Sequence, residues 1–261
     1  MQLRRPALAD PTAPLPAANA VAKLGAAAVT MLVALVSRDP FTPAILLIGL
    51  GLAMTQSGMR PAALARLVGP LLIAATLLGA LNGLLAGTPV GSSPGTVGDR
   101  FEIGLAVGLR IAAIALAGSL ALATTDPADL AAGLIAHLHV PARLAVGALA
   151  SLRLVPILGG ELQTIRLARR ARGVDAGRDP VAAVRLMLGA LVALLVSAIR
   201  RSSRMAVAMD ARGFDSRRPR TLARPPRMRT RDWLLLAASA SLGVAAVAIS
   251  LALGRWTSIF G

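Results

Sequence analysis

Residues 233–253 read WLLLAASASLGVAAVAISLAL and carry no charged side chain. A helix needs about 20 predominantly apolar residues to cross the hydrocarbon core of a bilayer, so this stretch is long enough to span a membrane. In lipid the backbone N–H and C=O groups of a single spanning segment must bond within that segment, and only the α-helix allows this. The stretch therefore predicts an all-α membrane protein.

Four more apolar runs precede this stretch and predict a polytopic protein. They cover residues 24–36, 41–55, 67–85 and 103–123. Together the runs predict about five transmembrane helices, of which the first two are short and need tilt or flanking polar residues to cross. The composition agrees, because 15% of the 261 residues are charged, whereas soluble domains carry about 25%.

Residues 124–231 differ from the rest of the chain in charge. Arginine occurs 19 times between residues 143 and 231, against five acidic residues. Because segments rich in Arg and Lys stay on the cytoplasmic side, residues 124–231 are predicted to form a basic cytoplasmic domain of long helices. Residues 181–199 are apolar enough for a sixth span, but a crossing there would place the arginines of 200–231 outside. We therefore expect a long interfacial or partly embedded helix at 181–199.

The predicted organisation has four parts, in the bacterial cytoplasmic (inner) membrane. Residues 1–19 are expected to form a disordered cytoplasmic tail, and its prolines and arginines do not resemble a signal peptide. Residues 20–123 hold the first four spans, and residues 124–231 form the cytoplasmic domain. Residues 232–261 hold the last span and an external C-terminus.

A five-residue motif occurs twice in the basic domain. Ala171-Arg172-Gly173-Val174-Asp175 returns forty residues later as Ala211-Arg212-Gly213-Phe214-Asp215, and each copy follows a helical pattern. Glycine just after a helix adopts the left-handed conformation without steric cost, and arginine in the last turn interacts favourably with the helix dipole. Two ordinary helix ends would look similar, but the repetition with matching neighbours favours a functional pair.

Paired Ala-Arg-Gly motifs are the signature of the transmembrane T components of energy-coupling factor (ECF) transporters, and the chain resembles this EcfT/CbiQ-type family. Three other stretches look similar to the family: residues 19–24 before the first span, Thr-Thr-Asp-Pro at 124–127, and Leu-Arg-Leu-Val-Pro at 152–156. The resemblance covers most of residues 19–253. The paired motif is its specific part.

The resemblance implies a non-catalytic coupling subunit of an ECF-type ABC importer. In that family the T component joins a small substrate-binding membrane subunit to two cytoplasmic ABC-type ATPases, for uptake of a vitamin or transition-metal ion. Long coupling helices end in the two motifs, and the motif arginines dock on the ATPases. Carried onto this chain, the ATPase-coupling residues are Ala171, Arg172, Gly173, Ala211, Arg212 and Gly213, and the supporting residues are Arg153, Pro156, Glu161, Asp175 and Asp215.

The sequence contains no enzymatic motif that withstands inspection. It lacks the Gly-x-x-x-x-Gly-Lys-Ser/Thr loop that binds phosphates, so the chain is not the ATPase and ATP hydrolysis is expected from partners. Residues 91–95 have the spacing of a nucleophile elbow, but Pro94 lacks the N–H that an oxyanion hole needs. With no cysteine, and with His137 and His139 on different sides of a helix, no catalytic, cofactor or metal site is predicted.

The fourth apolar run, 103–123, contains three residues whose roles the sequence leaves undecided. Gly104 and Gly108 allow another helix to approach closely, and packing within the chain is favoured over contact with a substrate subunit. Arg110 is an intramembrane charge, which marks a candidate functional residue. It could equally extend to the interface or pair with Glu102.

Two residues of the first predicted coupling helix have expected structural roles. Pro156 should bend the chain between the coupling helices, because proline removes a backbone hydrogen bond. Glu161 is expected to pair with a neighbouring arginine such as Arg166 or Arg169.

Two other classes of function stay open. A permease with its own substrate path usually has polar residues in several spans, and here only Arg110 and Asn82 qualify. A membrane-anchored binder of anionic lipid or nucleic acid could use the arginines of 217–220 and 224–231 for phosphate contacts. The basic domain lacks interleaved aromatic residues for base stacking, and juxtamembrane arginines suit anionic lipid head groups. We therefore expect the lipid bilayer, and no nucleic acid, among the partners.

Overall fold

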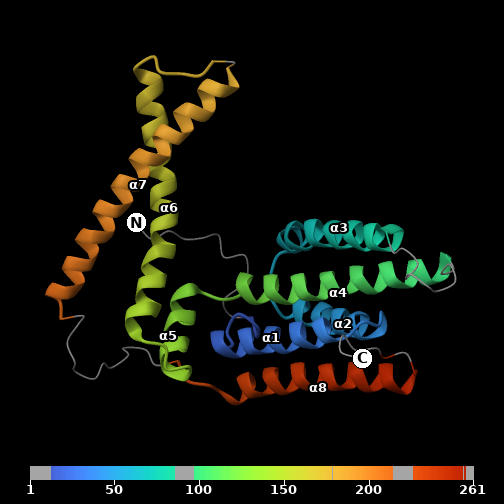
Figure 1. Cartoon of the computed structure of the whole chain (residues 1–261). Helices are drawn as coiled ribbons and strands as arrows, with labels where there is room; N and C mark the ends of the chain where they lie inside the picture. Colours follow the sequence, from blue (N-terminus) through green and yellow to red (C-terminus); the bar gives the residue numbers. More distant parts are fainter. Residues whose placement is uncertain (1–12, 86–96, 178, 214–225, 255, 257–261) are drawn as a thin grey trace. The chain divides into compact units, whose positions relative to one another are not determined.

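The computed structural model describes residues 13–85, 97–177, 179–213, 226–254 and 256, and in these the chain is helical without strands. The prediction of an all-α fold is therefore confirmed. The helices, labelled in Figure 1, are α1 (Ala20–Val36), α2 (Phe41–Thr55), α3 (Pro61–Leu85), α4 (Val97–Ala123), α5 (Pro127–His137), α6 (Ala142–Ala171), α7 (Pro180–Ala211) and α8 (Thr230–Ala252).

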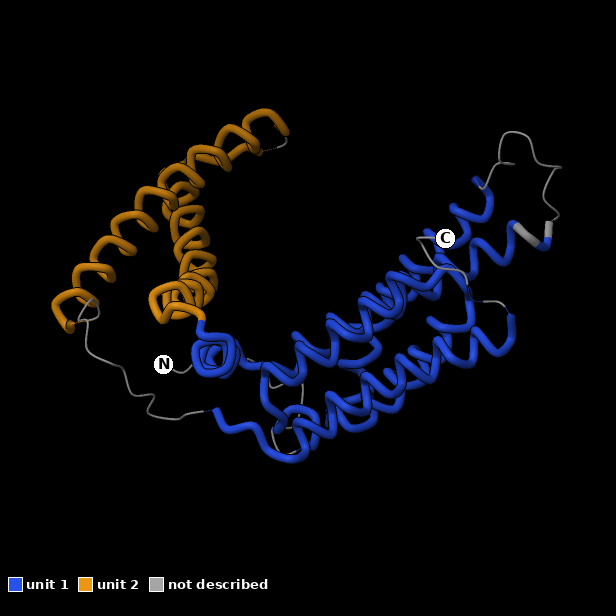
Figure 2. Tube along the Cα trace, turned by 60° about the horizontal axis from the view of Figure 1, so that its bottom comes forward, with its two compact units in different colours: residues 1–139, 225–261 blue, residues 140–224 orange. Residues whose placement is uncertain are grey.

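The chain divides into two compact units, coloured separately in Figure 2. Unit 1 comprises Met1–His139 and Pro225–Gly261, and unit 2 comprises Val140–Arg224. Unit 2 is thus an insertion in the sequence of unit 1, which the chain leaves after α5 and re-enters before α8.

Unit 1 is a helical bundle with a core of small side chains. Helix α4 packs against α1, α2 and α3, and α8 packs against α1 and α2. Ala34 of α1, Ala113 of α4 and Ala246 of α8 are fully buried around Leu46 of α2. Small residues let helix backbones approach closely, which stabilises packing where lipid supplies no hydrophobic driving force between helices.

Glycines form the contact between α3 and α4. A Cβ atom on Gly79 would lie 2.7 Å from the carbonyl oxygen of Gly104, and one on Gly83 would lie 2.8 Å from that of Arg100. A Cβ on Gly108 would lie 3.2 Å from the carbonyl oxygen of Ala75. The two backbones therefore touch, which confirms that the glycine pair of the fourth apolar run packs within the chain.

Among the residues that the structure describes, five helices are long and apolar enough to cross a membrane, namely α3, α4, α6, α7 and α8. The predicted spans 67–85, 103–123 and 233–253 coincide with α3, α4 and α8, and the runs at 24–36 and 41–55 form the shorter apolar helices α1 and α2. The chain is a multi-pass membrane protein. Helices α6 and α7 were expected to be cytoplasmic or interfacial, with 181–199 at most partly embedded, and length and composition alone also allow them to cross. The cytoplasmic placement of 124–231 therefore stays a prediction.

Residues 13–19 depart from the expected disordered tail. Leu15 is buried, and its N–H donates to the carbonyl oxygen of Gln56 at 3.3 Å. Asn19 caps α1, because its side-chain oxygen accepts from the N–H of Val21 at 2.9 Å. An apolar side chain and a capping residue hold this segment on the bundle, so the expectation of disorder is wrong for 13–19. Residues 1–12 lie outside the described part.

The described part of unit 2 consists mainly of α6 and α7, which cross each other (Figure 1) and are joined by residues 172–179. Ala145 and Ala190 are the buried residues of these helices. Large apolar side chains such as Val155, Leu188 and Val192 are exposed. Many exposed large apolar side chains on two helices are typical of contact with lipid or with another protein.

Candidate functional site

The first Ala-Arg-Gly motif forms the end of α6. The last helical residue is Ala171, and Gly173 has the left-handed φ of +74°. The N–H of Gly173 donates to the carbonyl oxygen of Arg170 at 2.9 Å, and that of Val174 donates to the carbonyl oxygen of Arg169 at 3.0 Å. These two bonds define a Schellman motif, in which the residues after the helix satisfy its last carbonyl groups.

The second motif ends α7 with the same geometry. Ala211 is the last helical residue, Gly213 has a φ of +72°, and its N–H donates to the carbonyl oxygen of Asp210 at 2.9 Å. Phe214 and Asp215 lie outside the described residues. The expectation that each motif ends a helix is confirmed for both copies.

Both motif arginines are exposed. Arg172 and Arg212 occupy the C-cap positions, and their side chains form no hydrogen bond or ion pair with any other residue that the structure describes. Because backbone N–H groups already bond the terminal carbonyls, the guanidinium groups are not used in capping. Each offers five donors in a fixed planar arrangement that matches carboxylates.

Gly173 is required by its backbone conformation and not by a close neighbour. A Cβ atom placed on it would have no atom within 4 Å, whereas its φ of +74° is one that residues with a side chain rarely adopt. The glycine of the motif therefore shapes the helix end. The arginine beside it is the member left available for contact.

Arginines near the end of α6 connect it to α7. Nη1 of Arg169 donates to the carbonyl oxygen of Leu186 at 2.6 Å, and Nη2 of Arg166 lies 3.0 Å from Sδ of Met187. A hollow of about 250 Å³ adjoins the first motif, and its walls include Arg166, Arg169, Arg170, Val174, Asp175 and Leu186. The last turns of α6 before the first motif are therefore basic, and Asp175 follows the motif as an acid.

Glu161 of α6 contacts α7. The hydroxyl of Ser197 donates to its Oε1 atom, and Nη2 of Arg201 lies 3.7 Å from its Oε2 atom. The expectation that Glu161 pairs with Arg166 or Arg169 is wrong, because those arginines contact the start of α7 instead. Glu161 contacts the turn of α7 that holds Ser197 and Arg201, whereas Arg166 and Arg169 contact the turn that holds Leu186 and Met187.

The remaining supporting residues are distributed along unit 2. Arg153 is exposed on α6, and Asp175 is exposed in the turn after it, where its Oδ1 atom accepts from the N–H of Ala176 at 2.8 Å. Pro156 lies inside α6, which continues past it to Ala171. The expected kink at this proline stays a prediction, and residues 172–179 join α6 to α7.

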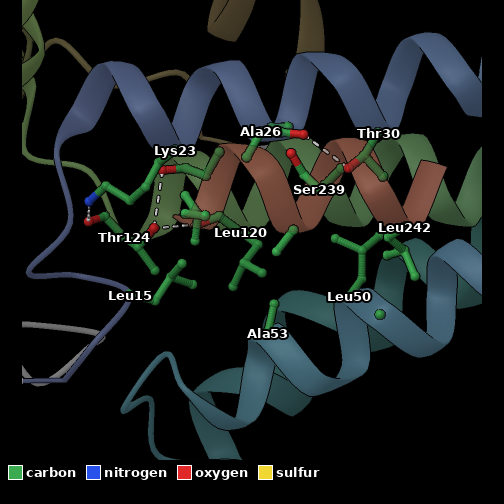
Figure 3. A pocket seen from close by; sticks show the side chains of 16 residues that line it. Leu15, Lys23, Ala26, Thr30, Leu50, Ala53, Leu120, Thr124, Ser239 and Leu242 are labelled. Atoms are coloured by element: carbon green, nitrogen blue, oxygen red, sulfur yellow. Dashed lines mark hydrogen bonds between the residues drawn. The ribbon is translucent and has the colours of Figure 1, made fainter. Parts of the chain in front are cut away.

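Unit 1 encloses a small apolar cavity of about 160 Å³ between α1, α2, α4 and α8. Figure 3 shows its polar lining residues bonded to backbone carbonyls: Thr30 donates to Ala26, and Nζ of Lys23 donates to Thr124 at 2.6 Å. Ser239, which also lines it, donates to the carbonyl oxygen of Leu236 at 2.9 Å. The cavity therefore presents few free polar groups to a solute.

Two charged residues of unit 1 have surroundings that their sequence positions did not indicate. Nε of Arg110 is buried and has no hydrogen-bond partner among the described residues. Asp232 is 1% exposed and accepts backbone hydrogen bonds from Asn19 and Arg229, both at 2.8 Å. The only sequence signal for Asp232 was an acid directly before the apolar run 233–253.

A family model described as cobalt transport protein, CbiQ, matches residues 12–222. This match includes α1 to α7 and both Ala-Arg-Gly motifs. The chain belongs to the CbiQ family. The resemblance drawn from the paired motifs is thereby confirmed.

Relatives of this CbiQ-family chain include proteins named energy-coupling factor transporter transmembrane protein EcfT. The protein of Limosilactobacillus fermentum is 36% identical over 136 residues, which are 49% of this chain and 51% of the relative. That of Bacillus subtilis is 36% identical over 126 residues, or 45% and 48%. That of Staphylococcus aureus is 32% identical over 142 residues, or 51% and 53%. The chain spans about half the length of the curated relatives it matches.

Proposed function

We propose that this protein is the transmembrane coupling subunit of an ECF-type ABC importer in the bacterial cytoplasmic membrane. It would transmit ATP-driven movements of two cytoplasmic ATPases to a small substrate-binding membrane subunit, which takes up a vitamin or a transition-metal ion. The observation that carries the proposal is the pair of long helices that end in matching Ala-Arg-Gly caps, each with an exposed arginine.

Helix-end geometry supports a docking role for the arginines. Since the glycine caps satisfy the terminal carbonyls, Arg172 and Arg212 are free to bind acidic side chains or carbonyl groups of a partner. The exposed alanine before each arginine keeps the approach unobstructed. Two equivalent contacts on two helices suit a partner that presents the same groove twice, as a dimer of ATPases does.

The contacts between α6 and α7 support movement of one helix against the other. They include the Arg169 bond to Leu186 and the Glu161 contacts with Ser197 and Arg201, while few residues of these helices are buried. A crossing held by a small number of polar contacts can change its angle without breaking a large core. Such changes of packed elements between discrete arrangements are a common basis of coupled transitions.

A permease with its own substrate path finds less support. Its path would need polar groups directed into a cavity, but the hydroxyl groups of Thr30 and Ser239 donate to carbonyl oxygens of their own helices. The cavity that they line is also small, at about 160 Å³. The chain lacks the phosphate-binding loop of an ATPase, so energy would come from partners.

The proposal is tested by co-purification from membranes with the organism's ATPase pair, comparing wild type with Arg172→Ala, Arg212→Ala and the double variant. Truncating one partner of a buried charged contact costs about 2–5 kcal/mol, so each single variant should weaken association roughly 30-fold or more. Arg172→Lys should lose much of the binding too, because lysine lacks the planar fork. Arg204, exposed on α7 outside the motif, supplies the matched control Arg204→Ala.

Two results would contradict the proposal. One is equal ATPase recovery by wild type and a membrane-inserted double variant, since the motifs would then be helix caps alone. The other is a failure of any ATPase to associate with the wild type. Binding of anionic vesicles or of nucleic acid, titrated with salt, would then decide whether the basic domain binds anionic lipid or nucleic acid.

A further inference from the structure

Both connections between unit 1 and the coupling helices start from helices that contact the same short segment. The chain leaves unit 1 two residues after α5 ends at His137, and it returns to unit 1 just before α8 begins at Thr230. Asn19, at the start of α1, touches both places. Its backbone N–H donates to Oδ1 of Asp232 at 2.8 Å, and its side-chain nitrogen lies 3.4 Å from Nε2 of His137.

Asp232 makes the contact with α8 strong. It is 1% exposed, and its second oxygen accepts from the N–H of Arg229 at 2.8 Å, which forms part of the cap of α8. Next to it, Arg231 donates to the carbonyl oxygen of Ala17. Hydrogen bonds to an ionised carboxylate are about twice as strong as neutral ones. The segment 17–19 is therefore bonded to the first turn of α8 at two points.

Lys23 and Gly133 complete the arrangement around α1. Nζ of Lys23 donates to the carbonyl oxygen of Thr124, which ends α4, at 2.6 Å, and to that of Pro16 at 3.3 Å. A Cβ atom on Gly133 of α5 would lie 2.8 Å from Cγ2 of Val21, so α5 packs directly on the first turn of α1. We call Ala17, Asn19, Lys23, Asp232 and His137 the Asn19 network.

We infer that the Asn19 network holds the end of α5 and the start of α8 against α1, so that a displacement that reaches either helix is passed on to α1. The connection from α5 to α6 is short, at residues 138–141, and is soft unless its unit 1 end is held. Asn19 holds that end through His137, and it holds the start of α8 through Asp232. Helix α1 in turn packs on α4 and α8 in the core of unit 1. Asn19 and Asp232 are thus positioning residues for the transmission step, an inference that rests on the proposed function.

The inference requires that the contacts of the Asn19 network persist while α6 and α7 move in response to ATP. If the network only stabilised the fold, its contacts would bear no relation to that movement. The chain contains no native cysteine, so pairs of introduced cysteines can carry spin labels without background. Leu32 of α1 and Leu138 after α5 are exposed at 60% and 59% and form a pair that reports the network. Leu167 of α6 and Val207 of α7, exposed at 64% and 69%, report the coupling helices.

The experiment measures both label distances in the full-length chain in nanodiscs, alone and with the ATPase pair, with and without ATP and vanadate. In the wild type, the 167/207 distance should change with ATP while the 32/138 distance stays constant and narrow. In Asp232→Asn and in Asn19→Ser, which retains a capping side chain for α1, the 167/207 change should persist. The 32/138 distribution should broaden in both variants, because Asn19→Ser removes the contact with His137 and Asp232→Asn weakens the bond that places Asn19. Loss of a neutral hydrogen bond worth about 1 kcal/mol raises the released population roughly fivefold.

Matched controls separate this effect from general damage. Asn82→Ser alters an exposed asparagine that bonds within its own helix, to Leu78, and Asp39→Asn alters another buried carboxylate of unit 1. Neither should broaden the 32/138 distribution. The inference is overturned if the network variants leave that distribution narrow, or if the wild-type 32/138 distance itself changes with ATP.

Failure of the proposed function gives a different result. The wild-type 167/207 distance would then not respond to ATP, or no ATPase would bind. The measurement on the chain alone still decides whether Asp232 and Asn19 hold α5 on α1, because it needs no partner.

Discussion

The glycine contact between α3 and α4 allows a sharp test of the packing in unit 1. A Cβ atom on Gly79 would lie 2.7 Å from the carbonyl oxygen of Gly104 and 2.9 Å from Cα of Gly108. Both neighbours are backbone atoms, so Gly79→Ala forces the helices apart instead of shifting a flexible side chain. Overpacking of this kind costs about 1–3 kcal/mol.

Gly51 of α2 provides the control in the same unit. A Cβ atom there would have no atom within 4 Å, so Gly51→Ala adds a methyl group without a clash. Both substitutions share the gain in helix propensity, up to about 1 kcal/mol in favour of alanine. The difference in unfolding free energy between the two variants therefore isolates the clash, and we expect Gly79→Ala to be less stable than Gly51→Ala by about 1–3 kcal/mol.

The assay is reversible unfolding in mixed micelles by titration with a denaturing detergent, followed by circular dichroism. Gly118→Ala adds a second comparison, because its close neighbour is the terminal Cε atom of Met31 at 2.6 Å, which can move aside. Its cost should be smaller than that of Gly79→Ala. Equal stability of the Gly79→Ala and Gly51→Ala variants would refute the reasoning that backbone contact holds α3 on α4.

Two further predictions concern polar contacts. Glu161→Gln should lower the unfolding free energy by less than about 1 kcal/mol in the same titration. It removes only the charge facing Arg201, whose side chain is 40% exposed, and it keeps an acceptor for Ser197. The difference from wild type should shrink as salt is added, and a larger loss or a difference that salt does not change would contradict this. Asp39 should contribute to stability at neutral pH and lose that contribution in acid. Burial raises the pKa of Asp39, but hydrogen bonds from Ser37, the N–H of Thr42 and Ser250 outweigh it and lower the pKa below its ordinary value. The stabilisation is therefore complete above the ordinary carboxyl pKa and is lost as pH falls through the lowered one. In thermal melts from pH 7 to pH 3, the difference between wild type and Asp39→Asn should stay constant near neutral pH and begin to narrow once the pH falls below the ordinary carboxyl pKa. A difference that stays constant down to pH 3 would contradict the prediction.

Local sequence features were sufficient to predict several elements. The apolar runs at 67–85, 103–123 and 233–253 predicted α3, α4 and α8, because uninterrupted apolar length is itself the condition for a spanning helix. The two Ala-Arg-Gly motifs predicted the ends of α6 and α7, since a glycine with positive φ terminates a helix through bonds to the preceding turn alone. The family also followed from these motifs.

Contacts between distant residues were decided only by the tertiary structure. Glu161 meets Arg201 and not an arginine of its own helix, because the crossing of α6 and α7 sets which turns face each other. Asn19 and Asp232 are 213 residues apart in the chain, and no local pattern relates a helix cap to an acid at that distance. Sequence by itself determined which apolar segments are helical and where α6 and α7 end, since those properties depend on neighbouring residues. Only the packing of α1, α5 and α8 decided that one asparagine contacts both the end of α5 and the start of α8, because such a contact depends on how the helices are placed in space.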